Sequence, residues 1–180
     1  MNVEKTSLDG VLLIKPESFS GAGGEVSHDD RGAYLEIYNR AKYKEHGIDI
    51  DFVEDDISVS KKDVLRGIHG DKKTWKLISC VHGEVLFVAV NCDSKSPLFG
   101  KWESFGLSDS NHWSVLVPPM YGSAYLALGD NVIFHYKQSS YYNREGQFSY
   151  RWDEPRFGID WPIKNPILSE RDANAKYVEG

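Results

Sequence analysis

The sequence predicts an all-β fold, a single jelly-roll-like domain over residues 1–180. Short runs rich in β-branched and aromatic residues follow one another along most of the chain, and turn signals such as Pro118-Pro119 and Gly129-Asp130 separate them at close spacing. This rhythm is typical of an antiparallel sandwich or barrel, whereas a parallel sheet needs a helix between successive strands. Aromatic residues form 13% of the chain, and their rings suit the pleated surfaces of such sheets.

Eight runs are predicted as strands, in chain order: residues 10–15, 31–38, 50–60, 75–81, 84–90, 113–118, 123–128 and 132–137. A further strand-like run begins at Val64 and is expected to break at Gly70 and Asp71. Short helices are predicted over residues 39–47, which end at a glycine, and over residues 169–176, which begin at the N-cap Ser169. The Gly-rich segment 19–30 is predicted as a surface loop, with a lid over the site as the alternative. It is not a dinucleotide-binding motif, because it lacks the third glycine and the following helix.

Charge and hydropathy exclude several classes of protein. The net charge of -6 argues against a nucleic-acid-binding surface, and no apolar run is long enough to span a membrane. The N-terminal segment MNVEKTSLDGVLLIK contains acidic residues and lacks the apolar core of a signal peptide. Cys80 and Cys92 lie in apolar runs and form no disulfide framework. We therefore expect a soluble cytoplasmic protein with neither a nucleic acid nor a membrane as partner.

Metal and nucleophilic chemistry find little support in the sequence. The six histidines are scattered without an HxH pair, and there is no G-x-S-x-G motif or activated cysteine. General acid–base chemistry is better supported, because His69 lies between two cations, Arg66 and Lys76, in a strand-like stretch. Cations beside a base suit an anionic substrate or a developing oxyanion. The alternative is a structural histidine at a solvated strand end.

Four tyrosines in the segment 133–152 offer a second kind of acid. They are Tyr136, Tyr141, Tyr142 and Tyr150. A tyrosine can donate a proton or present its ring to a base or a sugar. Tyrosines at these spacings more often pack across strands, so most of the four are expected to be structural.

Eight sequence blocks in a fixed order carry a resemblance to a known family. They are VLRGIHGD, KLISCVHGEVLFVAVN, SPLFGKW, LSDSN, LVPPMYGSAYLAL, YKQSSYYN, RWDEPRFGIDWP and PILSERD. Together they resemble the dTDP-4-dehydrorhamnose 3,5-epimerase family over residues 10–172. The resemblance implies a cupin-type jelly roll, a nucleotide-diphosphate sugar as substrate, no metal or other cofactor, and a homodimer with exchanged N-terminal strands.

The resemblance also assigns roles to residues in the matching motifs. His69, in RGIH, falls at the catalytic base, and Asp172, in LSERD, falls at its carboxylate partner. Tyr136 falls at the acid that returns a proton from the opposite face of the sugar. Arg66 and Lys76 fall at positions that bind the diphosphate sugar or steady an enolate.

Further residues fall at substrate-binding positions of the family. Arg31, Tyr34 and Glu36 lie in a segment that touches the nucleotide, commonly across the dimer. Tyr142 falls near the pocket wall, and Glu54 and Ser123 fall at positions that line the substrate site.

The chain departs from the family pattern at several of these positions. Ser123 stands where the family carries a second histidine, Gly70 replaces a bulky residue beside the base, and the acidic run 54–56 (EDD) replaces the family's QDN. The smaller Gly70 and Ser123 predict room for a bulkier sugar, and the carboxylates favour guanine over thymine, since they accept its N–H groups. RGIHGD looks like the branch of the family that acts on GDP-linked 4-keto-6-deoxy heptoses.

The function that the resemblance implies is epimerisation of a nucleotide-linked 4-keto-6-deoxy hexose or heptose. The base would remove a proton beside the C4 ketone to give an enolate, and the tyrosine would reprotonate the carbon from the opposite face, inverting C3, C5 or both. Two alternatives stay open: a sugar-nucleotide-binding cupin without turnover, and a 3,4-ketoisomerase.

Overall fold

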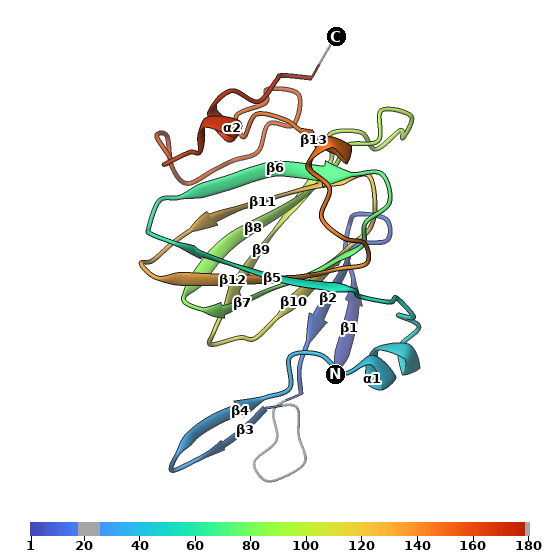
Figure 1. Cartoon of the computed structure of the whole chain (residues 1–180), viewed down its shortest axis with the longest axis vertical. Helices are drawn as coiled ribbons and strands as arrows, with labels where there is room; N and C mark the ends of the chain where they lie inside the picture. The colour runs from blue at the N-terminus through green and yellow to red at the C-terminus, as the bar shows by residue number, and fades with distance from the viewer. Residues whose placement is uncertain (18–25, 179–180) are drawn as a thin grey trace.

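The computed structural model describes residues 1–17 and 26–178. Two sheets with antiparallel ladders face each other (Figure 1), so the predicted all-β jelly roll is confirmed. The six-stranded sheet has the order β1 (Asn2–Lys5), β2 (Leu12–Lys15), β10 (Ser114–Val117), β7 (Lys76–His82), β12 (Val132–Gln138) and β5 (Glu54–Ser60). The five-stranded sheet has the order β13 (Gln147–Ser149), β6 (Leu65–Asp71), β11 (Tyr121–Ala127), β8 (Glu84–Asn91) and β9 (Trp102–Ser108).

The strand β6 corrects one prediction, because it continues through Gly70 to Asp71 without a break. A β-carbon on Gly70 would lie 2.4 Å from both the Phe148 ring and the carbonyl oxygen of Tyr121. Gly70 is therefore a position of close packing between neighbouring strands, which only a residue without a side chain can occupy.

Two short helices form where the sequence predicts them. The helix α1 (Arg40–Glu45) begins after Asn39, whose side chain accepts hydrogen bonds from two backbone N–H groups, and Gly47 follows the helix with a φ of 81°. In α2 (Glu170–Ala173), the predicted N-cap Ser169 accepts a hydrogen bond from the backbone N–H of Asp172. These caps satisfy backbone groups that would otherwise lack a partner.

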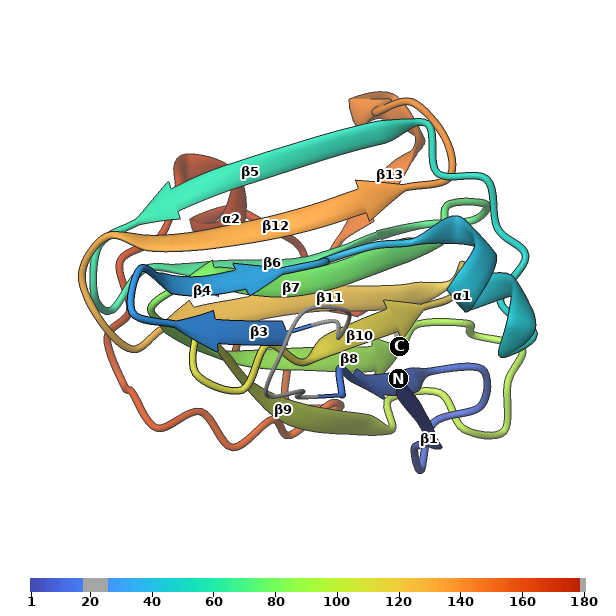
Figure 2. The same cartoon turned by 90° about the horizontal axis from the view of Figure 1, so that it is seen from below.

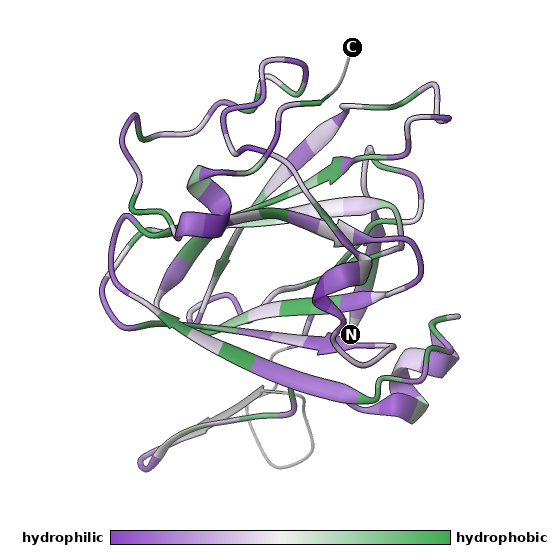
Figure 3. Ribbon diagram, turned by 45° about the horizontal axis from the view of Figure 1, so that its top comes forward, coloured by the Kyte–Doolittle hydropathy of each residue, from purple (hydrophilic) through white to green (hydrophobic). Residues whose placement is uncertain are grey.

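Three apolar clusters hold the sheets and the chain termini together. The first fills part of the space between the sheets, with Phe87, Phe134 and Leu107 among its members. The second packs the C-terminal segment, with Phe157 and Trp161, against the outer face of the five-stranded sheet. The third packs α1 and residue Ile48 against the six-stranded sheet. Apolar residues recur within the strands, whereas the helices and loops are mainly polar (Figure 3).

A two-stranded hairpin, β3 (Val26–Asp29) and β4 (Gly32–Leu35), extends below the sandwich (Figure 1), so it lies in front of the sheets when the molecule is seen from below (Figure 2). The segment predicted as the loop 19–30 thus ends in a strand, and its residues 19–25 lie outside the described part of the chain. We call residues 26–35 the arm. Among the described residues, no helix has the length and apolar character needed to cross a membrane.

Candidate active site

A bulge in β6 turns both Arg66 and His69 into the space between the sheets. In a regular strand, residues three apart face opposite sides. Here Ser123 pairs with His69 but Tyr125 pairs with Arg66, so β6 carries one more residue than β11 over this stretch. Gly67, within the bulge, has a φ of 123°, which favours glycine. Both Arg66 and His69 consequently line one cavity of about 600 Å³.

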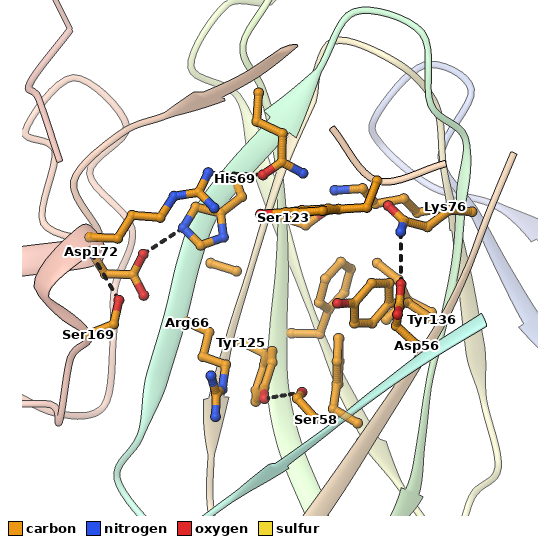
Figure 4. A pocket seen from close by; sticks show the side chains of 18 of the residues that line it. Asp56, Ser58, Arg66, His69, Lys76, Ser123, Tyr125, Tyr136, Ser169 and Asp172 are labelled. Carbon is orange, nitrogen blue, oxygen red and sulfur yellow. Dashed lines mark hydrogen bonds and ion pairs between the residues drawn. The ribbon is translucent and has the colours of Figure 1, made fainter. Parts of the chain in front are cut away.

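His69 and Asp172 form a hydrogen-bonded pair in the wall of this cavity (Figure 4). The Nε2 atom of His69 lies 2.5 Å from Oδ1 of Asp172 and donates to it. The cap at Ser169 holds the first turn of α2, and α2 contacts β6, which delivers the carboxylate to the imidazole across 103 positions of sequence. The Asp172 side chain is 3% exposed. With Nε2 engaged, Nδ1 is left to accept a proton.

The pKa of Asp172 keeps its carboxyl ionised, as a carboxylate that orients a basic histidine must be. Burial acts to raise its pKa, but the hydrogen bond and charge of His69, with the hydrogen bond from Ser169, outweigh burial and hold the pKa below its ordinary value. An ionised Asp172 fixes the tautomer of His69 and stabilises the imidazolium that forms when the base takes a proton.

Tyr136 faces the same cavity from the opposite sheet. It lies on β12, whereas His69 lies on β6, so the two groups stand on facing walls (Figure 4). Burial, with smaller effects of Asp56 and other neighbours, raises the pKa of Tyr136 to about 12. The phenol is therefore protonated at neutral pH and can act as an acid. Within the described part of the chain, no hydrogen bond occupies its hydroxyl.

Lys76 supplies a buried positive charge to the cavity. Its side chain, on β7, is 9% exposed, and burial lowers its pKa, with Arg171 acting in the same direction and Asp71 opposing. Arg66 stands at the rim, with Nε donating to Ser60 and Nη2 to the carbonyl of Val59. Cations thus occur both inside the cavity and at its edge.

Carboxylates line another part of the wall, on β5. Glu54 and Asp56 both accept hydrogen bonds from the amide of Gln138, at 2.7 and 2.9 Å. Glu54 also accepts from the backbone N–H of Tyr142, at 3.0 Å, which places the half-exposed Tyr142 ring at the cavity. Burial and the neighbouring Glu54 raise the pKa of Asp56.

The structure corrects the prediction that Gly70 enlarges the pocket. The ring of Phe148 occupies the space beside Gly70, and Gly70 is absent from the residues that line the cavity. Ser123, in contrast, does line it, directly opposite His69 on the neighbouring strand. Its hydroxyl oxygen is buried and has no hydrogen-bond partner among the described residues.

Arg31, Tyr34 and Glu36 lie outside this cavity in the same chain. Arg31 and Tyr34 belong to the exposed arm, where Tyr34 is 70% exposed. Glu36 pairs with Lys42 at 2.8 Å and accepts from Asn39. Within one chain, the cavity therefore brings together His69, Asp172, Tyr136 and Lys76. Arg31, Tyr34 and Glu36 do not line it.

Arg171 is a cavity residue that our sequence analysis did not identify. Its place beside Asp172 in the LSERD block was the available signal. Over residues 1–17 and 26–178, no three His, Cys, Asp or Glu side chains converge in a group that could hold a metal ion.

Fold and cavity define a jelly-roll protein of the cupin type, with a His–Asp pair that faces a protonated tyrosine. Comparison with known proteins agrees: the family model for dTDP-4-dehydrorhamnose 3,5-epimerase matches residues 5–179. The enzyme of that name from Methanothermobacter thermautotrophicus is 37% identical over 96% of this chain and 91% of its own. This chain belongs to the dTDP-4-dehydrorhamnose 3,5-epimerase family.

Solved structures give the same relationship. The dTDP-6-deoxy-D-glucose-3,5-epimerase of Legionella pneumophila, in complex with dTDP-4-keto-L-rhamnose, is 34% identical and superposes with a TM-score of 0.88, covering 98% of this chain and 92% of that one. A 3'-monoepimerase of Streptomyces bikiniensis, in complex with dTDP-quinovose, is 29% identical with a TM-score of 0.86, covering 96% and 85%.

Proposed function

We propose that this protein epimerises a nucleotide-diphosphate-linked 4-keto-6-deoxy sugar at one or both carbons beside the ketone. One observation supports this above all others. The His69–Asp172 pair and the protonated Tyr136 stand on opposite walls of a single cavity. A base on one side and an acid on the other are what inversion of a carbon centre requires.

The steps follow from the positions of these groups. Nδ1 of His69 removes the proton from the carbon next to the ketone, and Asp172 stabilises the resulting imidazolium. The electrons of the C–H bond move to the ketone oxygen, and the buried charge of Lys76 stabilises the enolate. Tyr136 then protonates the carbon from the other face. Arg66, at the rim of the cavity, binds the diphosphate.

The arm supports a further part of the proposal, a homodimer in which each arm reaches the site of the other copy. Arg31 and Tyr34 are exposed on the arm and lie outside the cavity of their own chain. Ile57 and Val59, on the outer face of β5, are 64% and 58% exposed. Apolar side chains exposed in this way favour association with a second surface.

The nucleobase proposed for this site is guanine. Asp56 and Glu54 present acceptors near the Tyr142 ring, and guanine offers more N–H donors than thymine does. Glu54 has a second task, because its carboxylate holds the backbone of Tyr142. Asp56 is therefore the carboxylate with more capacity to accept from a base.

Product analysis tests the proposed function. The protein is incubated with dTDP- and GDP-linked 4-keto-6-deoxy hexoses and heptoses, and the ketone is then reduced with borohydride. Proton coupling constants around the ring of the resulting C4 alcohols report the configuration at C3 and C5. We expect inversion of at least one centre, faster with the GDP sugars. Unchanged configuration at both centres in every sugar would contradict the proposal.

A further inference from the structure

The helix α2, which carries Asp172, has only four residues. A helix of this length does not hold itself together, because it closes too few hydrogen bonds to offset the entropy lost in ordering its backbone. Its position therefore depends on the chain at either end. On the N-terminal side, the backbone N–H of Ile167 donates to the carbonyl of Asp63 at 2.8 Å, and the carbonyl of Ile167 accepts from the N–H of Leu65 at 3.0 Å. These two bonds tie the chain that leads into α2 to the start of β6.

Arg151 holds the C-terminal end of α2. Its Nη1 atom donates to the carbonyl of Ala173, the residue after Asp172, at 2.7 Å. A carbonyl in the last turn has no partner within the helix, and a positive charge at this end is favourable. Nε and Nη2 of Arg151 donate to the two carboxylate oxygens of Asp153, at 2.7 and 3.0 Å. This bidentate ion pair fixes the plane of the guanidinium and so directs Nη1 toward the helix.

The segment around Arg151 also binds the chain that follows α2. The backbone N–H of Arg151 donates to the carbonyl of Lys176 at 3.1 Å. The carboxylate of Glu154, a residue that is 3% exposed, accepts from the N–H of Val178 at 2.7 Å and from that of Arg156 at 2.9 Å. The two segments are therefore joined on both sides of the Arg151 side chain, and a shift of α2 would break contacts in both.

The hydrogen bond between Asp172 and His69 depends on where α2 lies. Nε2 of His69 and Oδ1 of Asp172 are 2.5 Å apart, and this bond helps to hold the pKa of Asp172 below its ordinary value despite burial. Hydrogen bonds weaken steeply when their distance or angle departs from the favourable range. The Asp172 side chain is 3% exposed, so water has little room to bridge a wider gap. A displaced α2 would therefore leave His69 without its partner.

We propose that Arg151 is a positioning residue for the base: by holding the end of α2, it keeps the carboxylate of Asp172 within hydrogen-bond distance of His69. The inference rests on the proposed function, in which His69 takes the proton from carbon. Arg151 is not one of the described residues that line the cavity, so it acts through Asp172 and not on the substrate. Its loss should therefore slow the chemical step and leave binding intact.

Steady-state kinetics of Arg151→Ala and Arg151→Lys, with binding of the nucleoside diphosphate alone, test the inference. We expect Arg151→Ala to lower kcat for inversion by about 10–10²-fold, as misplacement of a catalytic group by about 1 Å can, with unchanged affinity for the nucleoside diphosphate. The acidic limb of the pH profile of kcat should move to lower pH, because an imidazolium with a weaker carboxylate partner gives up its proton more readily. Arg151→Lys, which keeps a positive charge at the end of α2, should recover part of kcat. The matched control is Arg40→Ala, since Arg40 also pairs with an aspartate, Asp51, but lies on α1.

Two further variants separate positioning from a general loss of stability. Asp153→Asn removes the charge that fixes the Arg151 guanidinium and should lower kcat by a smaller factor, so the test stands even if Arg151→Ala does not fold. In an Asp172→Asn background, Arg151→Ala should have little further effect on the residual kcat, because the two residues act as one unit. Wild-type kcat in Arg151→Ala, a lower kcat with an unmoved pH profile, or the full loss again in the Asp172→Asn background would overturn the inference. If the wild-type protein inverts no centre, the proposed function itself fails, so the two failures are distinguishable.

Discussion

Each side chain at the cavity has a role that its surroundings define. Burial raises the pKa of the Tyr136 phenol to about 12, and His69 helps to hold the pKa of the Asp172 carboxyl below its ordinary value despite burial, so each group keeps its protonation state well beyond neutral pH. Under the proposed function, the cavity offers a base on one wall and an acid on the other, in the protonation states that inversion needs at neutral pH.

The phenol of Tyr136 gives the first prediction. In Tyr136→Phe, His69 still removes the proton, but no acid returns one from the opposite face, so inversion should fall by about 10²–10⁴-fold while exchange with solvent persists. Because burial raises the pKa of Tyr136 to about 12, the acid form is lost only as the pH rises toward that value. We expect no loss of wild-type inversion from this group between pH 7 and about 10. Equal losses of inversion and exchange in Tyr136→Phe would contradict the assignment. Tyr141→Phe is the control, because Tyr141 is 74% exposed and does not line the cavity.

Replacing Ser123 is expected to raise the stability of the protein and to lower its activity. Its buried hydroxyl has no partner among the described residues, and an unsatisfied buried hydroxyl costs about 1 kcal/mol or more. Ser123→Ala should therefore raise the melting temperature by about 2–4 °C, while kcat/KM for the sugar nucleotide falls several-fold. Thermal denaturation and kinetics measure the two effects. A lower melting temperature would show that the hydroxyl stabilises the fold, and unchanged kinetics would show that it does not serve the substrate; either result contradicts the prediction.

At the scale of elements, β6 shows what sequence patterns can and cannot predict. The apolar runs predicted most strands. Ser169 marked the start of α2, and Gly47 marked the end of α1. The bulge at Gly67 and the packing of Gly70 against Phe148 depend on partners far away in sequence, so Gly70 was wrongly interpreted as a break. The short β13 and the strand β9, with its charged and hydroxyl residues, lacked an apolar pattern.

Packing around Gly70 gives the prediction at this scale. In Gly70→Ala the new methyl group would meet the Phe148 ring and the Tyr121 carbonyl, both at 2.4 Å. We expect the free energy of unfolding to fall by about 1–3 kcal/mol, measured by urea denaturation. Adding Phe148→Leu should not restore it, because the carbonyl of Tyr121 still blocks the methyl group. Full recovery in the double variant would show that Phe148 alone requires the glycine. Gly106→Ala is the control, since a β-carbon there meets no atom within 4 Å.

At the scale of the whole molecule, the cavity is a product of both sheets and of the C-terminal segment. The sequence blocks identified His69, Asp172 and Tyr136 through a family resemblance, and the fold brings them together. Composition and spacing alone could not pair His69 with a residue 103 positions away. The place of Arg171 beside Asp172 in the LSERD block was a signal in the sequence, but its hydrogen bonds to β13 exist only in three dimensions.

Association of two copies gives a prediction for the intact protein. Replacing Ile57 and Val59 by lysine places charge on the apolar outer face of β5, where both residues are mainly exposed. Sedimentation velocity should show a dimer for the wild type and a monomer for the double variant, with weaker nucleotide binding by the monomer. Ile167→Lys is the control, because Ile167 is 55% exposed and lies outside both β5 and the arm. A wild-type monomer, or a variant that stays dimeric, would argue against this interface.

Incorporation of solvent deuterium tests the central claim most directly. The wild type, His69→Asn and Tyr136→Phe are each incubated in D₂O with a nucleotide-linked 4-keto-6-deoxy sugar, and NMR locates the label and the configuration. We expect label with inversion for the wild type, label without inversion for Tyr136→Phe, and neither for His69→Asn. Label at C3 and C5 would make the protein a double epimerase, and label at one carbon a monoepimerase. A wild-type protein that binds the sugar nucleotides and incorporates no deuterium would contradict the account.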